Sequence, residues 1–298
     1  DRVPYPVGKI LGKTPMSLRL GRQYEHFTNL SNAPYPTLRN LQLVQCKNLI
    51  DFAQAHVVFY QDHFRINDYL SGSIDSFDDF SAIPIAHKSD LQKYSTEQRS
   101  VRRLALKKSN TGGTTGQPLD FYIEKSAYAR EWAHMHAIWA TLGYRYTDEK
   151  ITIRGKNIGS RFYKYNFNQN EFLINAYVPL QENLAACREL ITKRNIQWIH
   201  GYPSSVYSFL RELESLDAVL FEVLIKKVRG VFLGSEYPAP QYRNYIEQHC
   251  RLRSISWYGH SEMAVLAPER EPGSGVYYPF HSYGYAEAVP DRESHRLV

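Results

Sequence analysis

Three short apolar segments in the second half of the chain each end in a turn of glycine, proline or small polar residues, and this repetition constrains the fold most strongly. Residues 196–200 lead into Gly201-Tyr202-Pro203, residues 228–233 into Gly234-Ser235-Glu236, and residues 252–257 into Tyr258-Gly259. The segments alternate with helical patterns, which favours a mainly parallel sheet flanked by helices. Because ligands lie beyond the carboxyl ends of such strands, we expect the three turns to line one crevice.

The remaining patterns also predict an α/β fold. Residues 119–123 and 151–153 have strand patterns, and residues 125–141 have a helical pattern. Apolar residues recur at helical spacing from Val206 to Leu213, so another helix begins near Ser204. The Ser204 side chain either caps that helix or faces an anion at its N-terminus. We therefore assign residues 101–298 to the α/β part of the chain, which would contain this crevice.

Residues 1–100 are predicted to form a helical N-terminal lobe. Within residues 38–59, apolar side chains recur near helical spacing, which predicts one amphipathic helix. These side chains are Leu41, Val44, Phe52, Ala55 and Phe59. The pattern is broken further along by Ser71-Gly72-Ser73.

The segment Ser109-Asn110-Thr111-Gly112-Gly113-Thr114-Thr115-Gly116-Gln117-Pro118 has a composition suited to phosphate binding. Its glycines allow positive φ and close approach of the backbone to a ligand, while backbone N–H groups and threonine hydroxyls donate to phosphate oxygens. The spacing differs from a Walker loop, because Gly113 and Gly116 enclose only two residues. The segment also lacks the Gly-x-Gly-x-x-Gly dinucleotide pattern.

Composition favours a cytoplasmic protein. With 43% hydrophobic residues over 298 positions, the chain can bury a sizeable core. No apolar run approaches the roughly 18 residues needed to span a bilayer, and the N-terminus lacks a secretory signal pattern. Cys46, Cys187 and Cys250 lie far apart in the sequence, which favours reduced thiols over a disulfide framework.

Charge and reactive residues exclude several functions. The formal charge of +6 is compatible with a polyanionic ligand, and basic residues at 99–103 and 107–108 either raise the potential near the glycine-rich loop or form a solvated edge. No RNA or DNA motif is present, so nucleic-acid binding is not expected. His134 and His136 point about 200° apart on a helix, which prevents joint metal ligation. Residues 259–263 lack the second glycine of a serine-hydrolase elbow.

Thr111 to Pro118 resembles, in register, the Thr-Ser-Gly-Thr-Thr-Gly-Lys-Pro phosphate loop of the adenylate-forming superfamily. Four further blocks are similar to one branch, the phenylacetate-CoA ligases and CapK-like polysaccharide-biosynthesis proteins. These blocks are residues 77–91, His200 to Tyr207, Leu233 to Glu236, and Tyr258 to Glu262. The resemblance implies the large N-terminal domain of an adenylate-forming enzyme.

The resemblance also implies a set of site residues. Phosphate would be bound by Thr111, Gly112, Gly113, Thr114, Thr115 and Gly116, and the adenosine by Gly234, Ser235, Glu236, Tyr258 and Gly259. Glu262 would hold magnesium, for which a hard carboxylate oxygen is a suitable ligand. Candidates for the substrate pocket are Trp132, His136, Arg154, His260 and Ser261, with Arg154 as a partner for the acid.

The implied reaction is ATP-dependent carboxylate activation: an acyl-adenylate forms and its acyl group passes to CoA or to an amine or saccharide. The resemblance further suggests a role in polysaccharide biosynthesis and a homodimer. Relatives often carry zinc-binding cysteines after the Ser-Glu block, whereas Ala267-Pro268-Glu269-Arg270 has no thiol, so zinc is not expected.

Two departures support an alternative, a nucleotide-binding or scaffold module without catalysis. Gln117 stands where the superfamily commonly has lysine, and Gly112 where it commonly has serine. The chain also ends at Val298, before the hinge and the small C-terminal domain with its catalytic lysine, so we expect that domain to be absent from it.

Overall fold

The computed structural model describes residues 3–72, 74–101, 106–111, 118–155, 158–290 and 295–297. The chain forms two compact units that interleave along the sequence. The sheet unit comprises residues 1–25, 132–258 and 267–278, and the helical unit comprises residues 26–131, 259–266 and 279–298. The predicted boundary at residue 100, between an N-terminal lobe and an α/β part, stays a prediction.

The sheet unit is built on a seven-stranded sheet of order β4-β5-β3-β6-β7-β8-β9. Its strands are β3 (Glu149–Ile153), β4 (Tyr163–Asn166), β5 (Glu171–Ile174), β6 (Ile196–Gly201), β7 (Gly230–Leu233), β8 (Ser254–Gly259) and β9 (Leu266–Pro268). Strands β5, β3, β6, β7 and β8 pair in parallel, and β4 is antiparallel to β5. The predicted α/β class and mainly parallel sheet are therefore confirmed.

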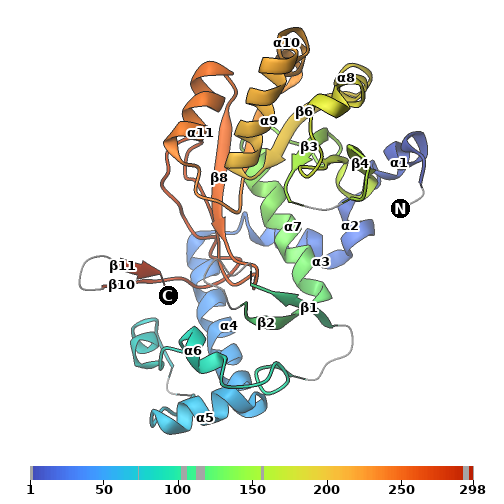
Figure 1. The fold of residues 1–298 in the computed structure, drawn as a ribbon. Coiled ribbons are helices and arrows are strands. Elements are labelled where there is room, and N and C mark those ends of the chain that lie inside the picture. Colours follow the sequence, from blue (N-terminus) through green and yellow to red (C-terminus); the bar gives the residue numbers. More distant parts are fainter. Residues whose placement is uncertain are drawn as a thin grey trace. The chain divides into compact units, whose positions relative to one another are not determined.

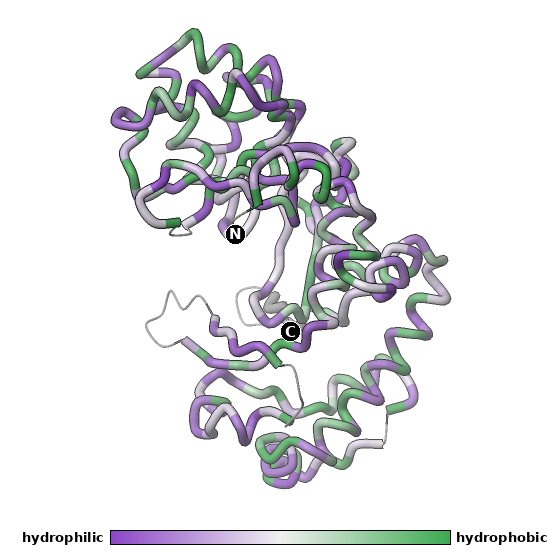
Figure 2. The backbone as a smooth tube through the Cα atoms, turned by 90° about the vertical axis from the view of Figure 1, so that its right-hand side faces the viewer, coloured by the Kyte–Doolittle hydropathy of each residue, from purple (hydrophilic) through white to green (hydrophobic). Residues whose placement is uncertain are grey.

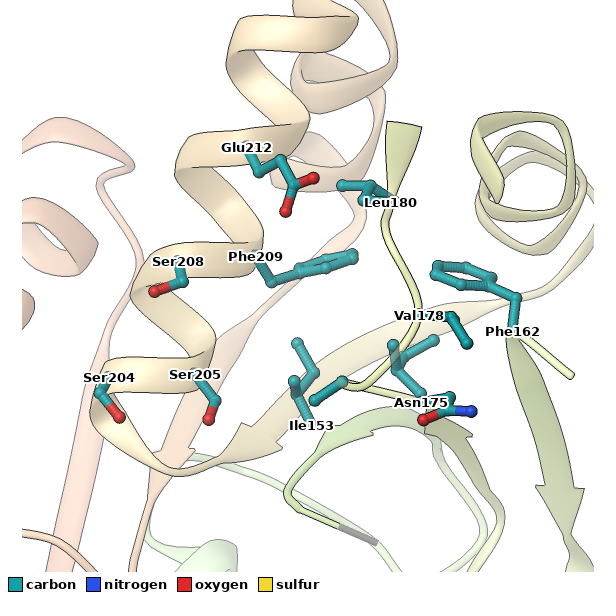
Figure 3. Close-up of a pocket in the computed structure, with 12 residues that line it drawn as sticks. Ile153, Phe162, Asn175, Val178, Leu180, Ser204, Ser205, Ser208, Phe209 and Glu212 are labelled. Atoms are coloured by element: carbon teal, nitrogen blue, oxygen red, sulfur yellow. The ribbon is translucent and has the colours of Figure 1, made fainter. Parts of the chain in front are cut away.

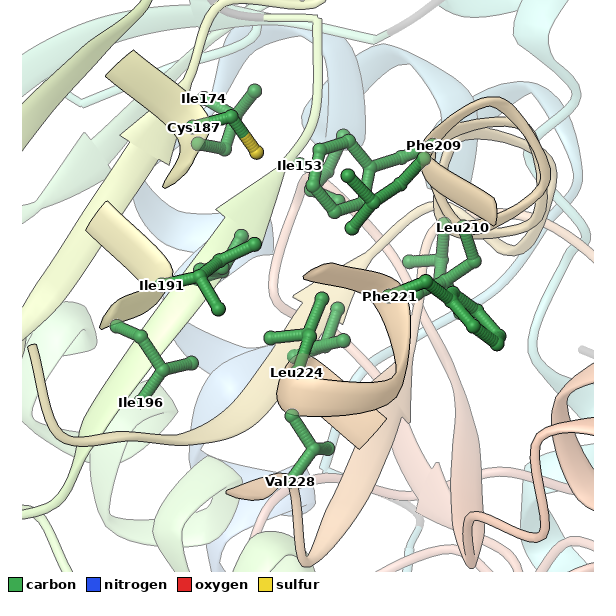
Figure 4. Packing of buried hydrophobic residues seen from close by; sticks show 14 of the residues in the cluster. Ile153, Ile174, Cys187, Ile191, Ile196, Phe209, Leu210, Phe221, Leu224 and Val228 are labelled. Carbon is green, nitrogen blue, oxygen red and sulfur yellow. The ribbon is translucent and has the colours of Figure 1, made fainter. Parts of the chain in front are cut away.

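Three helices pack together on one face of this sheet. They are α8 (Leu184–Lys193), α9 (Pro203–Leu216) and α10 (Ala218–Lys227), and α11 (Pro240–Asn244) with a π-helical turn (Tyr245–His249) follows β7. Figure 1 shows α9 and α10 beside β6. Figure 4 shows Ile153 and Ile196 of the sheet in one buried cluster with Leu210 and Leu224 of these helices. Because these helices cover one face and α7 packs on the other, strands such as β7 are continuous apolar runs rather than alternating patterns.

Aromatic side chains fill the opposite face of the sheet. The C-terminal part of α7 (Lys125–Ala140) places Trp139 parallel to Phe232 of β7, with ring centroids 4.8 Å apart. Phe232 stacks in turn on Trp198 of β6 at 5.1 Å. The N-terminal helices α1 (Tyr5–Leu11) and α2 (Met16–Leu20) belong to the same unit, and α3 (Arg22–Leu30) begins in it.

The helical unit contains the predicted N-terminal helix, which differs from the expectation. Residues 38–59 do not form one helix, because α4 (Tyr35–His56) ends before Val57, whose extended φ of −117° separates it from α5 (Val58–Ile66). The predicted apolar face of this helix was also wrong: Val44 is exposed, and the buried residues of α4 are Leu38 and Gln42. Gln42 is buried because its side chain donates to the carbonyl of Gly284.

Short elements complete the helical unit. They are a 3₁₀ turn (Asp78–Ala82), α6 (Lys88–Leu91), the hairpin of β1 (Leu106–Asn110) and β2 (Asp120–Glu124), and the hairpin of β10 (Ala288–Pro290) and β11 (His295–Leu297). Polar and apolar residues are interspersed along the chain (Figure 2), and among the described residues no helix is long and apolar enough to cross a membrane.

A buried ion pair joins α11 to the end of the sheet. The Arg243 guanidinium donates to both carboxylate oxygens of Glu269, at 2.6 and 2.7 Å, and the Glu269 side chain is fully buried. That carboxylate also accepts from the backbone N–H of Ser256 in β8 (2.9 Å) and of Gly275 (2.8 Å). The charge of Arg243 and these N–H donors outweigh the effect of burial and keep the pKa of Glu269 below its usual value.

We expect Glu269→Gln to lower the free energy of unfolding by about 3 kcal/mol, because it leaves the Arg243 charge buried without its partner. Urea unfolding of both proteins provides the measurement. Glu189→Gln is the matched control, since Glu189 pairs with Lys193 on the exposed surface of α8 and its loss should cost less than about 1 kcal/mol. Equal effects of the two substitutions would contradict the assigned role of Glu269.

Candidate active site

The carboxyl ends of β3, β6, β7 and β8 lie side by side at one edge of the sheet. Ile153 pairs with Gly201, Gly201 with Leu233, and Leu233 with Ser256. The ladder continues into the turns, because the Tyr202 N–H donates to the Ile153 carbonyl (3.3 Å) and the Gly234 N–H to the Gly201 carbonyl (3.2 Å). The turns after β6 and β7 therefore start from one edge of the sheet, whereas the prediction of a turn at Tyr258-Gly259 was wrong, because both residues belong to β8.

Two glycines at this edge allow neighbouring strands to approach closely. A side-chain carbon at Gly201 would lie 3.0 Å from Val206 Cγ2 and would overlap the Ile153 carbonyl. At Gly234 it would lie 2.9 Å from Cε2 of the Trp257 indole. Any larger residue would force backbone or an aromatic ring to move, so both positions require glycine.

The turn after β7 has a strained backbone and an acidic end. Ser235 has a φ of +66°, in the left-handed region that non-glycine residues rarely adopt and that is often found at functional sites. The exposed Glu236 accepts hydrogen bonds from the backbone N–H (3.2 Å) and the hydroxyl (3.0 Å) of Ser204. This carboxylate thus lies at the positive N-terminus of α9. The prediction that Ser204 caps α9 was wrong, because the cap position is Tyr202 and its side chain makes no capping bond.

Tyr258 stands at the end of β8 with 43% of its surface exposed. The preceding Trp257 is half-buried, and its ring lies 5.9 Å from the ring of His200. An exposed aromatic ring at a strand end offers a flat face to a planar base, and its hydroxyl offers a hydrogen bond at the rim.

A group of buried polar residues, here called the polar cluster, lies on the face of the sheet that α7 covers. Its members are Lys150 and Thr152 of β3, Glu171 of β5, His200 of β6, His136 of α7 and, at the end of β3, the half-buried Arg154. The Lys150 ammonium donates to the Tyr144 hydroxyl (3.2 Å) and to the carbonyl of Gln169. Glu171 accepts from the Thr152 hydroxyl and from the amide of Asn166, both at 2.8 Å.

The polar cluster has an excess of positive charge. Burial lowers the pKa of Lys150 to about 8, although Glu171 opposes this shift. Burial alone would raise the pKa of Glu171, but the charges of Lys150 and Arg154 outweigh it and the pKa is lowered. Burial, with the charge of Arg154, holds the pKa of His200 well below its usual value, so this imidazole is neutral at physiological pH. The Nδ1 atom of His200 is buried and has no hydrogen-bond partner among the described residues.

His136, a predicted pocket residue, is buried in the sheet unit. Its Nδ1 lies 2.8 Å from the Tyr24 hydroxyl, and its ring lies 5.6 Å from that of Trp132. Burial first, and then the charges of Lys150 and Arg19, lower the pKa of His136 to about 3. His136 is therefore neutral near pH 7 and is not a titrating base there.

The predicted phosphate loop begins at the end of a hairpin in the helical unit. Asn110 of β1 pairs with Asp120 of β2, and Thr111 closes the hairpin by donating its N–H to the Leu119 carbonyl (3.0 Å). The Thr111 hydroxyl oxygen accepts from the Leu119 N–H (2.9 Å). The other predicted phosphate-binding residues, Gly112, Gly113, Thr114, Thr115 and Gly116, lie outside the described residues.

The segment that follows β8 forms an exposed turn, also in the helical unit. The Met263 N–H donates to the His260 carbonyl (3.2 Å), and the Met263 carbonyl accepts from the Arg130 guanidinium (3.0 Å). Ser261 and Glu262 are exposed on this turn. A single exposed carboxylate suits magnesium, which usually takes its other ligands from water and substrate phosphates.

A small cavity opens where α9 begins. It has a volume of about 230 Å³ and lies between the first turns of α9 and the segment after β5. Figure 3 shows Ser205, Ser208 and Glu212 of α9 on one side, and Val178 and Phe162 on the other. This cavity has a mixed apolar and hydroxyl lining, and none of the predicted site residues that the structure describes lines it.

The structure places the predicted residues in two groups. Trp132, His136, Arg154, the Gly234 turn and Tyr258 belong to the sheet unit, whereas Thr111 and residues 259–262 belong to the helical unit. Sequence reasoning missed Lys150, Glu171 and His200. Lys150 carried no clear signal, because the predicted strand was residues 151–153 and a lysine just before a strand is ordinarily exposed.

The fold is that of the N-terminal domain of adenylate-forming ligases. An open conformation of 2-hydroxyisobutyryl-CoA ligase, solved in complex with 2-HIB-AMP and CoA, superimposes with a TM-score of 0.60 over 86% of this chain and 62% of its own, at 16% identity. An acyl acid amido synthetase in complex with 2,4-DB superimposes with a TM-score of 0.51 over 88% of this chain and 61% of its own, at 12% identity. No family model matches the sequence.

The chain is homologous to the protein CapK of Staphylococcus aureus. The two sequences are 23% identical over 271 residues, which cover 89% of this chain and 59% of CapK. The chain therefore spans about three fifths of the length of this curated relative and of the two ligases above.

We expect His136→Phe to flatten the dependence of stability on pH. The folded state lowers the pKa of His136 from 6.5 to about 3, so the stability from its neutral form is present above pH 6.5 and is lost as pH falls toward 3. Between these pH values, unfolding of the wild type takes up as much as one proton at His136. The slope of its free energy of unfolding against pH should therefore exceed that of the variant by up to about 1.4 kcal/mol per pH unit. Urea unfolding at several pH values measures the slope. Parallel profiles of the free energy of unfolding against pH for His136→Phe and wild type would contradict a buried neutral His136.

Proposed function

We propose that the chain is the nucleotide-binding large domain of an adenylate-forming ligase. In this reaction a substrate carboxylate oxygen attacks the α-phosphorus of ATP, the bond to the β-phosphate oxygen breaks, and an acyl-adenylate and pyrophosphate form. The observation that carries the proposal is the alignment of the turns after β6 and β7 at one sheet edge, beside β8, which carries the exposed ring of Tyr258. The shared fold of the two ligases supports it.

In this proposal the adenosine binds at the sheet edge and the phosphates bind at the glycine-rich loop. Tyr258 offers its ring to the adenine, and the Gly234-Ser235-Glu236 turn with Gly259 surrounds the nucleoside. Thr111 and the five residues after it donate to the phosphates. Glu262 holds magnesium, which would offset the negative charge on the phosphates. The exposed position of Glu262 fits this role.

We further propose that the substrate acid is attracted by the positive charge at the end of β3. Arg154 is half-buried, and its charge reaches Lys150, Glu171 and His200. A guanidinium in a partly desolvated site binds a carboxylate strongly and in a fixed orientation. Trp132 and His136 supply neutral walls, and His260 and Ser261 are the remaining pocket candidates.

The second half-reaction transfers the acyl group from the adenylate to a nucleophile, with release of AMP. CoA, an amine and a saccharide are the acceptor classes, and the resemblance of the sequence blocks to CapK-like proteins leads us to propose a role in polysaccharide biosynthesis. Because the reaction consumes ATP, we place the protein in the cytoplasm. We also propose that the protein forms a homodimer.

We expect Tyr258→Ala to weaken ATP binding about tenfold, because stacking on one base contributes roughly 1–3 kcal/mol. Calorimetric titration with ATP and magnesium measures this. Tyr278→Ala is the control, since Tyr278 is 50% exposed and should leave the affinity unchanged. Glu262→Gln should remove most of the dependence on magnesium. The site is wrong if ATP binds equally well without magnesium, or equally well to Tyr258→Ala.

We expect Arg154→Met to raise the KM for the cognate acid about a hundredfold, since loss of a charge-assisted pair costs roughly 2–3 kcal/mol. Pyrophosphate release with a panel of carboxylic acids identifies that acid and measures the change. ATP affinity of Arg154→Met should match wild type. ATP binding without pyrophosphate release for any acid would instead favour the nucleotide-binding module without catalysis.

A further inference from the structure

The helical unit contains a cavity of about 700 Å³ that the proposed function leaves unused. It lies between α4, α5 and residues 80–86, with Tyr285 and Glu287 in its lining. Pockets that enclose a small molecule commonly have volumes of roughly 300–1,000 Å³. The cavity is therefore large enough for a small ligand.

The lining of this cavity is mostly apolar. Phe64 and Phe80 are buried, whereas Leu49 of α4 and Ile85 of the loop are 65% and 53% exposed. Large aliphatic side chains that face solvent beside an open cavity offer surface to an apolar ligand. The lining therefore favours a ligand with a hydrocarbon body.

The polar groups in the lining favour a positively charged ligand. Glu287 is the one acidic or basic side chain among the described lining residues, and it accepts a hydrogen bond from the Tyr285 hydroxyl at 3.0 Å. Burial, with that hydrogen bond, raises the pKa of Tyr285 to about 12, so its hydroxyl keeps donating to Glu287 at neutral pH. Tyr285 is held by stacking on Phe77 at 5.2 Å and by an edge contact with Phe80 at 4.7 Å.

A nearby arginine is already engaged by other groups. The Arg39 guanidinium lies 6.0 Å from the Tyr285 ring centroid, but it sits 3.4 Å from that of Phe77 and donates to Gln42 at 2.7 Å. Arg39 does not line the cavity. The charge that a ligand meets there is the carboxylate of Glu287.

We propose that this cavity binds a small organic amine with an apolar body. The hydrocarbon packs on Leu49, Ile85 and the aromatic side chains, and the ammonium group lies at Glu287 beside the Tyr285 ring. A cation is attracted both by a carboxylate and by aromatic faces, and a carboxylate ligand is repelled by Glu287. The site differs in charge preference from the acid site at Arg154, and it does not rest on the proposed ligase activity.

Octylamine, octanol and octanoate test the proposal, since they share a hydrocarbon chain and differ in head group. In calorimetric titrations at neutral pH, octylamine should bind about tenfold more tightly than octanol, and octanoate should bind more weakly than both. Glu287→Gln should weaken octylamine binding about tenfold and leave octanol unchanged. Glu222→Gln on the exposed side of α10 is the matched control and should bind all three ligands as wild type does.

Ala53→Trp should abolish binding of octylamine and octanol, because it fills the cavity from α4 while the melting temperature shows that the protein is folded. The proposal is overturned if octanoate binds as tightly as octylamine, if Glu287→Gln has no effect on octylamine, if folded Ala53→Trp binds as wild type does, or if none of the three ligands binds. Glu287→Gln keeps the test decisive if Ala53→Trp does not fold.

Discussion

Parallel pairing of β3, β6, β7 and β8 is the constraint on which the candidate site depends. In a parallel sheet all carboxyl ends meet at one edge, and the ladder here continues into the turns through the carbonyls of Ile153 and Gly201. Gly201 and Gly234 allow this close approach, because any side chain there would meet backbone or the Trp257 indole. Backbone hydrogen bonds therefore set the spacing of the turns, and the loop sequences determine only which side chains each turn carries.

The buried charges of the sheet unit add a second constraint. Lys150, Arg154 and Arg19 outnumber the carboxylates of Glu171 and Asp148 in the interactions of the polar cluster, and burial first, then these positive charges, keep both histidines neutral. Burying such charges costs free energy, and Lys150 keeps its hydrogen bonds to Tyr144 and Gln169 as partial compensation. A site held this way attracts an anion without moving its own groups, which is the condition for electrostatic preorganisation.

The sequence predicted the strands and turns well because each carries a local signal. A run such as Val231-Phe232-Leu233 followed by Gly234 identifies both a buried strand and its end. The break at Val57 and the exposure of Val44 were not predictable from periodicity, because they depend on which side of α4 other segments cover. Likewise, the bond from Glu236 to Ser204 joins residues 32 positions apart. In the segment after the Tyr258 to Glu262 block, Glu269 pairs with Arg243, a contact that only the fold reveals.

The polar cluster and the α4–α5 cavity differ in the sign of the charge that they offer to a ligand. The polar cluster presents positive charge suited to an acid, whereas the cavity presents the carboxylate of Glu287. A guanidinium in one region and a carboxylate in the other each repel a ligand of like charge, so the two regions select opposite classes of ligand. The cavity is therefore not a second site for the acid that the polar cluster attracts.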